Sequence, residues 1–284
     1  MRHILLLLRL ILVSVVLSTV LGGGYLFLLR SAIPSQFEAG RSADLFARNV
    51  QRSVRRKAWA DTGVIRWSLL KNQHLWDLRR GLVRTRFNDR NAQHEVLFDV
   101  DFKRYIVKSK AYSGSKANRW VTVTEAEAES IAKDAYHYWL RDRFILEPSQ
   151  SLFDNNVERY LVTSGKDDKS LLVHYRKGGE HPGDSFLWSV DDKGLPSGIR
   201  FWSDQLYISG LEMKMEKWRI LQTGLKISTR RSIGPIHVDI KVSAAMSLTH
   251  LLGRVDPFKP IEGDPFDPPP NSQPNILKKK KPKP

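Results

Sequence analysis

The chain has 284 residues, a formal net charge of +16, and 41% apolar side chains that include 8 Trp, 8 Tyr and 12 Phe. It contains no cysteine, which excludes structural disulfides, cysteine-ligated zinc, thiol nucleophiles and a lipidated N-terminal cysteine. So basic a chain attracts polyanions, among which lipid headgroups and nucleic acids are the most common.

The N-terminal segment predicts a membrane anchor. Residues 10–29 are twenty consecutive uncharged residues, bracketed by Arg9 and Arg30. Such a run spans a hydrocarbon core of about 30 Å, because a helix rises about 1.5 Å per residue. We therefore expect one uncleaved transmembrane helix within residues 1–30. The alternative is a signal peptide cleaved near Gly24.

Residues 31–61 predict a basic juxtamembrane helix and linker. Phe46, Val50 and Val54 recur at helical spacing, and bases occupy the other faces, among them Arg52, Arg55 and Arg56. Two interpretations remain open. The helix either lies on anionic headgroups, or it docks on the globular domain and turns its charges toward water.

Residues 62–255 predict one β-rich globular domain. Apolar residues alternate with polar ones in 64–69, 82–87 and 96–102, which is typical of antiparallel strands with one buried face. Thr124 begins a helical pattern that continues to about residue 143. Short strands joined by turns follow from residue 157 onward. The expected fold class is α+β, mostly antiparallel β: a curved sheet or half-barrel with a covering helix, preceded by one transmembrane helix. Residues 256–284 are rich in Pro and Lys and predict a disordered tail.

Recognisable catalytic and cofactor motifs are missing from the sequence. The eight histidines show no H-E-x-x-H spacing, and there is no Walker loop, G-x-S-x-G elbow or dinucleotide fingerprint. We therefore predict no catalytic residue, cofactor or metal. Arg84 and Arg86 stand on alternate positions of one strand, which predicts a stripe that contacts phosphates. No nucleic-acid motif accompanies them, so nucleic acid is not an expected partner.

Two passages carry a resemblance to a known family. One is Trp188-Ser-Val-Asp-Asp-Lys-Gly-Leu-Pro followed by Ile199-Arg-Phe-Trp, and the other is Lys217-Trp-Arg-Ile-Leu-Gln-Thr-Gly-Leu-Lys-Ile-Ser. Residues 185–232, and less clearly 62–112, resemble the periplasmic lipoprotein-carrier half-barrels of the LolA/LppX-like group. The resemblance implies a curved antiparallel sheet that holds acyl chains in a cavity, and a periplasmic location. The chain departs from these carriers in its apparent anchor and its basic tail.

These observations favour a single-pass membrane protein whose extracytoplasmic, non-enzymatic domain binds lipid or an envelope partner. Two alternatives stay open: a structural or scaffold envelope protein, and a hydrolase acting on a lipid or cell-wall substrate. The expected partners are the membrane, anionic lipid or a lipoprotein, with a protein partner as a further possibility. The residues expected to line a ligand cavity are Trp67, Phe98, Val100, Trp188 and Trp202. Those expected to contact an anionic surface are Arg52, Arg55, Arg56, Arg84 and Arg86.

Overall fold

The computed structural model describes residues 31–114, 117–164, 168–176, 181–203 and 208–262. The predicted anchor within residues 1–30 and most of the predicted tail lie outside these ranges. Among the residues that are described, no helix is both long and apolar enough to cross a membrane. The described strands form two antiparallel sheets, neither closed into a barrel, accompanied by a few helices. The α+β, mostly antiparallel class is confirmed, but the strands divide between two sheets instead of forming one.

The described chain divides into two compact units, one formed by residues from 31–48 and 152–214 and the other by residues from 49–151 and 215–262. In the first unit, strands pair in the order β1-β8-β9-β10-β11-β12. Their bounds are Glu38–Ala39 (β1), Val157–Ser164 (β8), Asp168–Tyr175 (β9), Ser185–Val190 (β10), Pro196–Ser203 (β11) and Ile208–Ile220 (β12), and β12 continues into the second unit.

The start of the described chain is fixed to the first unit. The Ser31 backbone N–H donates to the Ser209 carbonyl at 3.1 Å, and the Trp202 indole donates to the Ser31 carbonyl at 2.6 Å. Gly210, with φ of +80°, allows this approach, since a Cβ there would stand 2.0 Å from the Ser31 hydroxyl. The residue that directly follows the predicted anchor is therefore held against β11 and β12.

The predicted juxtamembrane helix is present as α2, Arg41–Ser53, followed by a 3₁₀ turn, η1, Arg56–Trp59. Ala43, Ala47, Val50 and Val54 are buried, whereas the bases along the helix are exposed. Its apolar stripe thus packs against protein and its charges face water. Of the two interpretations above, the structure favours the docked one.

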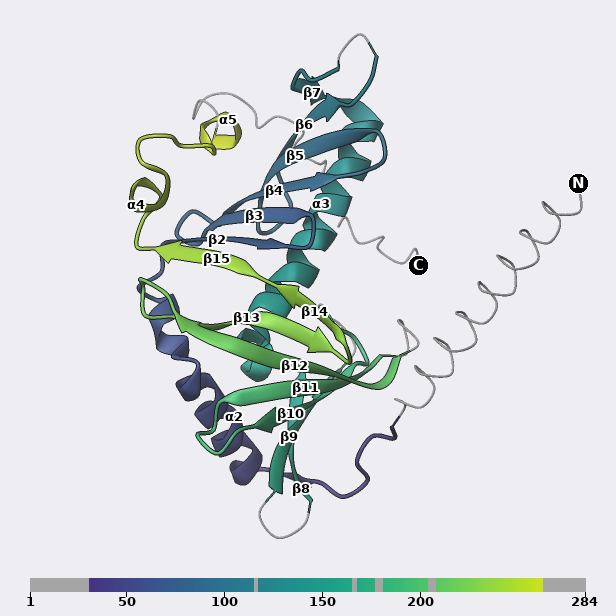
Figure 1. Cartoon of the computed structure of the whole chain (residues 1–284), viewed down its shortest axis with the longest axis vertical. Coiled ribbons are helices and arrows are strands. Elements are labelled where there is room, and N and C mark those ends of the chain that lie inside the picture. The colour runs from purple at the N-terminus through teal and green to yellow at the C-terminus, as the bar shows by residue number, and fades with distance from the viewer. Residues whose placement is uncertain (1–30, 115–116, 165–167, 177–180, 204–207, 263–284) are drawn as a thin grey trace, which may run out of the picture. The chain divides into compact units, whose positions relative to one another are not determined.

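The second unit contains a seven-stranded sheet in the order β15-β2-β3-β4-β5-β6-β7 (Figure 1). The strands are Lys241–Ala245 (β15), Val64–Leu69 (β2), Asn72–Asp77 (β3), Leu82–Asn88 (β4), Ala92–Asp99 (β5), Tyr105–Ala111 (β6) and Val121–Val123 (β7). Four further elements complete this unit beside the end of β12: β13 (Lys226–Ile233), β14 (Ile236–Asp239), α4 (Leu248–Leu252) and α5 (Lys259–Glu262). The 3₁₀ turn η2, Pro148–Phe153, crosses the boundary between the units.

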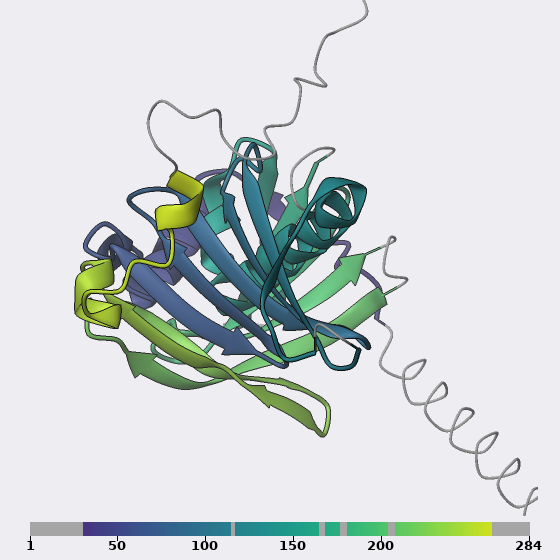
Figure 2. The same ribbon diagram turned by 90° about the horizontal axis from the view of Figure 1, so that it is seen from above.

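One face of this sheet is covered by α3, Glu125–Leu146, which contacts β4, β5 and β6 (Figure 2). The helix contributes Ala128, Ala132, Ala135 and Trp139 to the core, all almost fully buried. Small residues let the helix approach the sheet closely, and Trp139 fills the remaining volume between the rings of Trp76 and Phe98. This is the covering helix that the sequence predicts.

The opposite face of the sheet is partly buried, whereas the sequence predicts one buried face and one solvated face. A second apolar cluster lies there, and Phe258 and Ile261 from the end of the described chain are fully buried in it. The sequence places both residues in the Pro-rich tail. The composition of the tail hides them, because its few apolar side chains among many prolines give no periodic pattern.

Candidate anion-binding site

Strand register gathers basic side chains on the sheet face that lies opposite α3. Ser243 on β15 pairs with Arg66 on β2. Arg84 on β4 stands in the same row, with β3 between it and Arg66. The next row on the same face holds Lys241, Ser68, Gln73 and Arg86. Strands lie about 4.8 Å apart, so Arg66 and Arg84 are about 10 Å apart at their backbones. Long arginine side chains readily converge across that distance.

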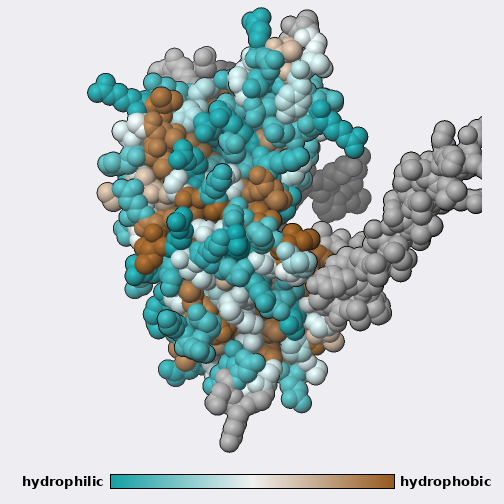
Figure 3. All heavy atoms as spheres, in the orientation of Figure 1, coloured by the Kyte–Doolittle hydropathy of each residue, from teal (hydrophilic) through white to brown (hydrophobic). Residues whose placement is uncertain are grey.

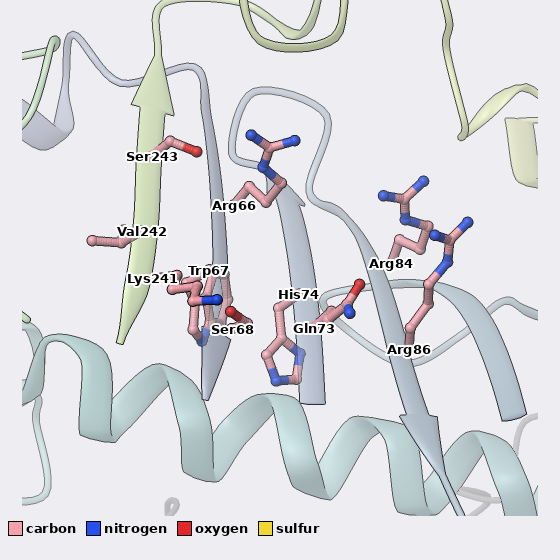
Figure 4. A pocket seen from close by; sticks show the side chains of 10 residues that line it. All are labelled: Arg66, Trp67, Ser68, Gln73, His74, Arg84, Arg86, Lys241, Val242 and Ser243. Atoms are coloured by element: carbon pink, nitrogen blue, oxygen red, sulfur yellow. The ribbon is translucent and has the colours of Figure 1, made fainter. Parts of the chain in front are cut away.

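A cavity of about 360 Å³ opens between these side chains. Figure 4 shows Arg66, Arg84 and Arg86 directed away from the helix, whereas His74 points toward it. The cavity is thus lined by cations and by uncharged polar groups: Arg66, Arg84, Arg86, Lys241, Ser68, Gln73 and Ser243. Its volume lies within the range of small-ligand sites.

Positive charge is in excess within the cavity. Arg86 donates to Glu95 at 2.6 Å, so one of the four cations is paired. Within the part of the chain that the structure describes, no carboxylate forms an ion pair with Arg66, Arg84 or Lys241. Arg84 is also partly buried, and desolvation together with repulsion from Arg86 lowers its pKa, although Glu95 partly opposes the shift. A partly buried guanidinium without a carboxylate partner is costly, and a bound anion would remove that cost.

A buried polar network supports the strands that carry these cations. The Asp142 carboxylate on α3 accepts hydrogen bonds from Asn72 at 2.9 Å and from Arg141 at 2.8 Å, and lies 2.9 Å from the Nε2 atom of His74. His74 Nδ1 is 3.0 Å from the Thr85 hydroxyl. Desolvation lowers the pKa of His74 despite the neighbouring carboxylate. The neutral ring, protonated on Nε2, therefore donates to Asp142 and accepts from Thr85.

The pKa of the Asp142 carboxyl is lower than its usual value, which favours the ionised form. Burial by itself would raise this pKa, but hydrogen bonds from His74 and Asn72 outweigh burial and lower it. The carboxylate therefore stays ionised while fully buried. Because His74 and Thr85 alternate with Gln73, Arg84 and Arg86 along β3 and β4, the network fixes the strands directly behind the cavity.

A second histidine lies in a chain of hydrogen bonds at the β5–β6 hairpin. His94 stands 2.7 Å from the Ser109 hydroxyl and 2.9 Å from Asp89. The order Ser–His–Asp is that of a hydrolytic triad. However, the other Asp89 oxygen accepts backbone N–H groups of Asn91 and Ala92 at 2.7 Å, which makes Asp89 the residue that closes the β4–β5 turn.

The residues predicted to line a ligand cavity occupy several places. Trp67 and Phe98 are about 1% exposed or less and belong to the core beneath α3. Val100, partly buried, packs at the edge of that core in the turn after β5. Trp188 and Trp202 belong to the other unit. Of the five, Trp67 also borders the basic cavity, on the strand between Arg66 and Ser68.

Two of the five arginines predicted to contact an anionic surface, Arg84 and Arg86, line the cavity. Arg52 lies near the end of α2 and donates to the Asn49 side chain, and Arg55 and Arg56 follow at the 3₁₀ turn. None of these three borders the cavity. Arg66 and Lys241 complete it and were missed by sequence reasoning. Arg66 stands alone between apolar residues on β2, and no local pattern reveals that β15 pairs with β2 from about 175 residues away.

Other classes of site receive less support from the described residues. No group of three or more His, Asp or Glu side chains there could hold a metal ion. On the face shown in Figure 3, apolar residues form separate small groups among hydrophilic ones. A broad apolar surface would mark a docking interface, and this face lacks one.

Comparison with known proteins gives a weak structural likeness. No protein-family model and no curated protein matches the chain. The fold is similar to a DUF1329 family protein from Desulfovibrio piger (7% identity, TM-score 0.32, covering 71% of this chain and 92% of that chain). It is also similar to a putative outer membrane lipoprotein-sorting protein domain from Vibrio parahaemolyticus (9% identity, TM-score 0.28, covering 70% and 91%). The weak resemblance to lipoprotein-sorting domains is thus found by structure as well as by sequence, and we draw no functional argument from it.

Proposed function

We propose that this protein is a membrane-tethered, non-enzymatic binding domain whose cationic cavity holds the phosphate-bearing headgroup of an anionic lipid. The observation that carries the proposal is Arg84, a partly buried guanidinium without a carboxylate partner among the described residues, flanked by Arg66, Arg86 and Lys241. Guanidinium groups bind phosphate through paired N–H donors, and each base near an anionic headgroup contributes about 1 kcal/mol.

The tether supports a lipid source for this anion over a free phosphate. The uncharged run at residues 10–29 is long enough to span a bilayer, and Ser31, just beyond it, is bonded to folded strands. A domain held at a membrane meets lipid headgroups at high effective concentration. We expect the domain to lie on the extracytoplasmic side, and its basic charge does not oppose this, because large domains are translocated largely regardless of their charge.

The test compares lipid retained by the purified full-length protein with that retained by two variants. Arg84→Gln/Arg86→Gln removes two cations from the cavity, whereas Arg90→Gln removes one exposed arginine from a turn outside it. Each protein is extracted with organic solvent and its phospholipids are counted per chain by mass spectrometry. We expect anionic phospholipid near one per chain in the wild type and in Arg90→Gln. The double variant should lose it.

A binding titration gives the magnitude. Two bases contribute about 2 kcal/mol, so the double variant should bind an anionic alkyl phosphate about 30-fold more weakly, while Arg90→Gln should stay within about twofold of the wild type. Equal affinity in all three proteins would refute the proposed site. A folded double variant that retains its anionic lipid would refute it as well.

A second candidate function is hydrolysis, and the Ser109–His94–Asp89 chain is the observation that favours it. Nucleophilic catalysis needs a serine hydroxyl that a base can deprotonate, and His94 is within reach of Ser109. A fluorophosphonate probe distinguishes the two functions, because it labels an activated serine. Labelling that disappears in Ser109→Ala would support the hydrolase.

A further inference from the structure

The sheet face that carries the cavity has an apolar band and, next to it, a polar band. On five neighbouring strands an apolar residue stands two positions from a polar or charged one, so both project from the same face. The apolar band consists of Ala245, Val64, Leu75, Leu82 and Leu97, and the polar band of Ser243, Arg66, Gln73, Arg84 and Glu95. The boundary between the bands is staggered, because Leu75 and Leu97 pair in register with Arg84. The carboxylates of Asp77 and Asp99 stand in register with Leu82, at the outer side of the apolar band, where Arg80 and Arg104 pair with them. Five neighbouring strands are separated by four spacings of about 4.8 Å, so the apolar band is about 19 Å long. This length is comparable to that of an extended long acyl chain.

The two bands differ in what covers them. Four members of the polar band, Ser243, Arg66, Gln73 and Arg84, line the cationic cavity. The apolar band is covered by the chain itself, through Phe258 and Ile261, which are 0% and 1% exposed. Both come from a short segment, residues 256–262, that follows α4 and contains only the single turn of α5. In Figures 1 and 2 this segment lies beside the sheet formed by β2–β6.

A compact ion cluster holds the covering segment in place at its two ends. Arg80 donates to Asp256 at 2.8 Å and to Glu262 at 2.8 Å, and its guanidinium lies 5.3 Å from the centre of the Phe258 ring. Asp77 orients Arg80 through a third hydrogen bond at 2.9 Å. Beyond these contacts, Arg104 donates to the Ile261 carbonyl at 3.5 Å, and the segment is otherwise anchored by its two buried side chains. Such a cover can be displaced without unfolding the sheet beneath it.

We infer that the apolar band is the acyl-chain half of the ligand site, and that Phe258 and Ile261 occupy it when no ligand is bound. This inference rests on the proposed function, since it assigns a tail to the ligand whose headgroup enters the cationic cavity. The ligand is then an anionic amphiphile with one phosphate and a long alkyl or acyl chain. The ligand is inferred from both parts of the site together. An apolar peptide would leave the cations of the cavity without a partner, and a free phosphate or a nucleic acid would make no use of the apolar band.

The test uses the absence of cysteine from the chain. Ile261→Cys places a single thiol on the buried side of the covering segment. The full-length protein is studied in nanodiscs of zwitterionic phosphatidylcholine. The rate of maleimide labelling is measured without additive and with three probes: dodecyl phosphate, inorganic phosphate and dodecyl maltoside. Dodecyl phosphate should raise the rate at least tenfold. Inorganic phosphate, which lacks a tail, and dodecyl maltoside, which lacks a charge, should leave it within twofold.

Two further variants separate displacement from unfolding. Val107→Cys carries a thiol in the core beneath α3, and its labelling should not respond to dodecyl phosphate. Lys259→Cys places a nitroxide on the exposed side of α5, and its mobility should rise with the same probe even if Ile261→Cys folds poorly. Asp256→Asn/Glu262→Gln removes the ion cluster. It should raise the basal labelling rate and tighten dodecyl phosphate binding, because less free energy is then needed to open the cover.

The outcomes distinguish this inference from the proposed function. If dodecyl phosphate binds in a manner that depends on Arg84 and Arg86 but neither reporter at 259 or 261 responds, the acyl site is refuted and the anion site remains. If its binding is indifferent to Arg84 and Arg86, both are refuted. If the response of Val107→Cys equals that of Ile261→Cys, the probe acts by unfolding and the acyl site is refuted.

Discussion

Replacing Asp142 tests whether the polar network behind the cavity stabilises the strands that carry it. The carboxylate is fully buried and accepts hydrogen bonds from Asn72, His74 and Arg141. Asp142→Ala leaves two buried donors, on Asn72 and His74, without a partner. Each such donor costs about 1–3 kcal/mol, so leaving both without a partner costs about 3–5 kcal/mol.

Asp142→Asn provides the matched comparison. The amide oxygen can take the position that faces His74 and Asn72, and its NH₂ group then faces Arg141, whose side chain is half exposed and free to turn toward water. The variant keeps the shape and two acceptor interactions, so it should cost only about 1–2 kcal/mol. We therefore expect Asp142→Ala to be the less stable of the two variants by at least about 1 kcal/mol.

Thermal unfolding of the full-length proteins, followed by tryptophan fluorescence, measures the difference. For a unit of this size 1 kcal/mol corresponds to about 2–4 °C, so Asp142→Ala should unfold about 6–20 °C below the wild type. Its affinity for dodecyl phosphate should fall at temperatures where it is still folded, because β3 and β4 lose their support. An Asp142→Ala protein within 2 °C of the wild type would refute the reasoning.

Three further predictions concern single side chains. Arg84→Gln should raise the melting temperature by a few degrees in the absence of ligand, because it removes a partly buried, unpaired charge; an unchanged or lower value would contradict this. The lowered pKa of His74 means that the unfolded chain takes up its proton first, so the contribution of His74 to stability is present above about pH 6.5 and is lost on acidification. The urea midpoint of unfolding should therefore change less between pH 7.5 and pH 5 in His74→Gln than in the wild type. An equal change in both proteins would contradict the role of His74 in this pH dependence. A fluorophosphonate probe should leave Ser109 unlabelled, because Asp89 is engaged by turn amides.

Local patterns in the sequence predict most of the secondary structure and the fold class. Alternation along β2 and β4 and the helical stripe that includes Ala128 and Trp139 reflect burial against a neighbour, which is the quantity that periodicity measures. The two-sheet arrangement was not predictable in this way, because each strand pattern is compatible with several partners. The pairing of β15 with β2 joins segments far apart in the chain and determines where Lys241 lies.

The candidate site was predictable only in part for the same reason. Arg84 and Arg86 alternate on one strand, and that pattern is visible in the sequence. Arg66 and Lys241 join them through the register of four strands, and register is decided by tertiary packing. Phe258 was hidden for a different reason: the apolar residues of the Pro-rich segment show no periodicity, and the burial of Phe258 depends on an apolar band that only the assembled sheet presents.

The partial burial of Arg84 distinguishes the cavity from the rest of a basic surface. With 46 bases against 30 acids, unpaired cations are expected by chance, and an exposed one such as Arg90 needs no explanation. Arg86, beside Glu95, shows how a cation on this face is ordinarily balanced. Arg84 stands next to that pair, loses part of its hydration, and receives repulsion from Arg86. Folding would be favoured by a neutral residue at this position, so a bound anion is the simplest compensation for an arginine there.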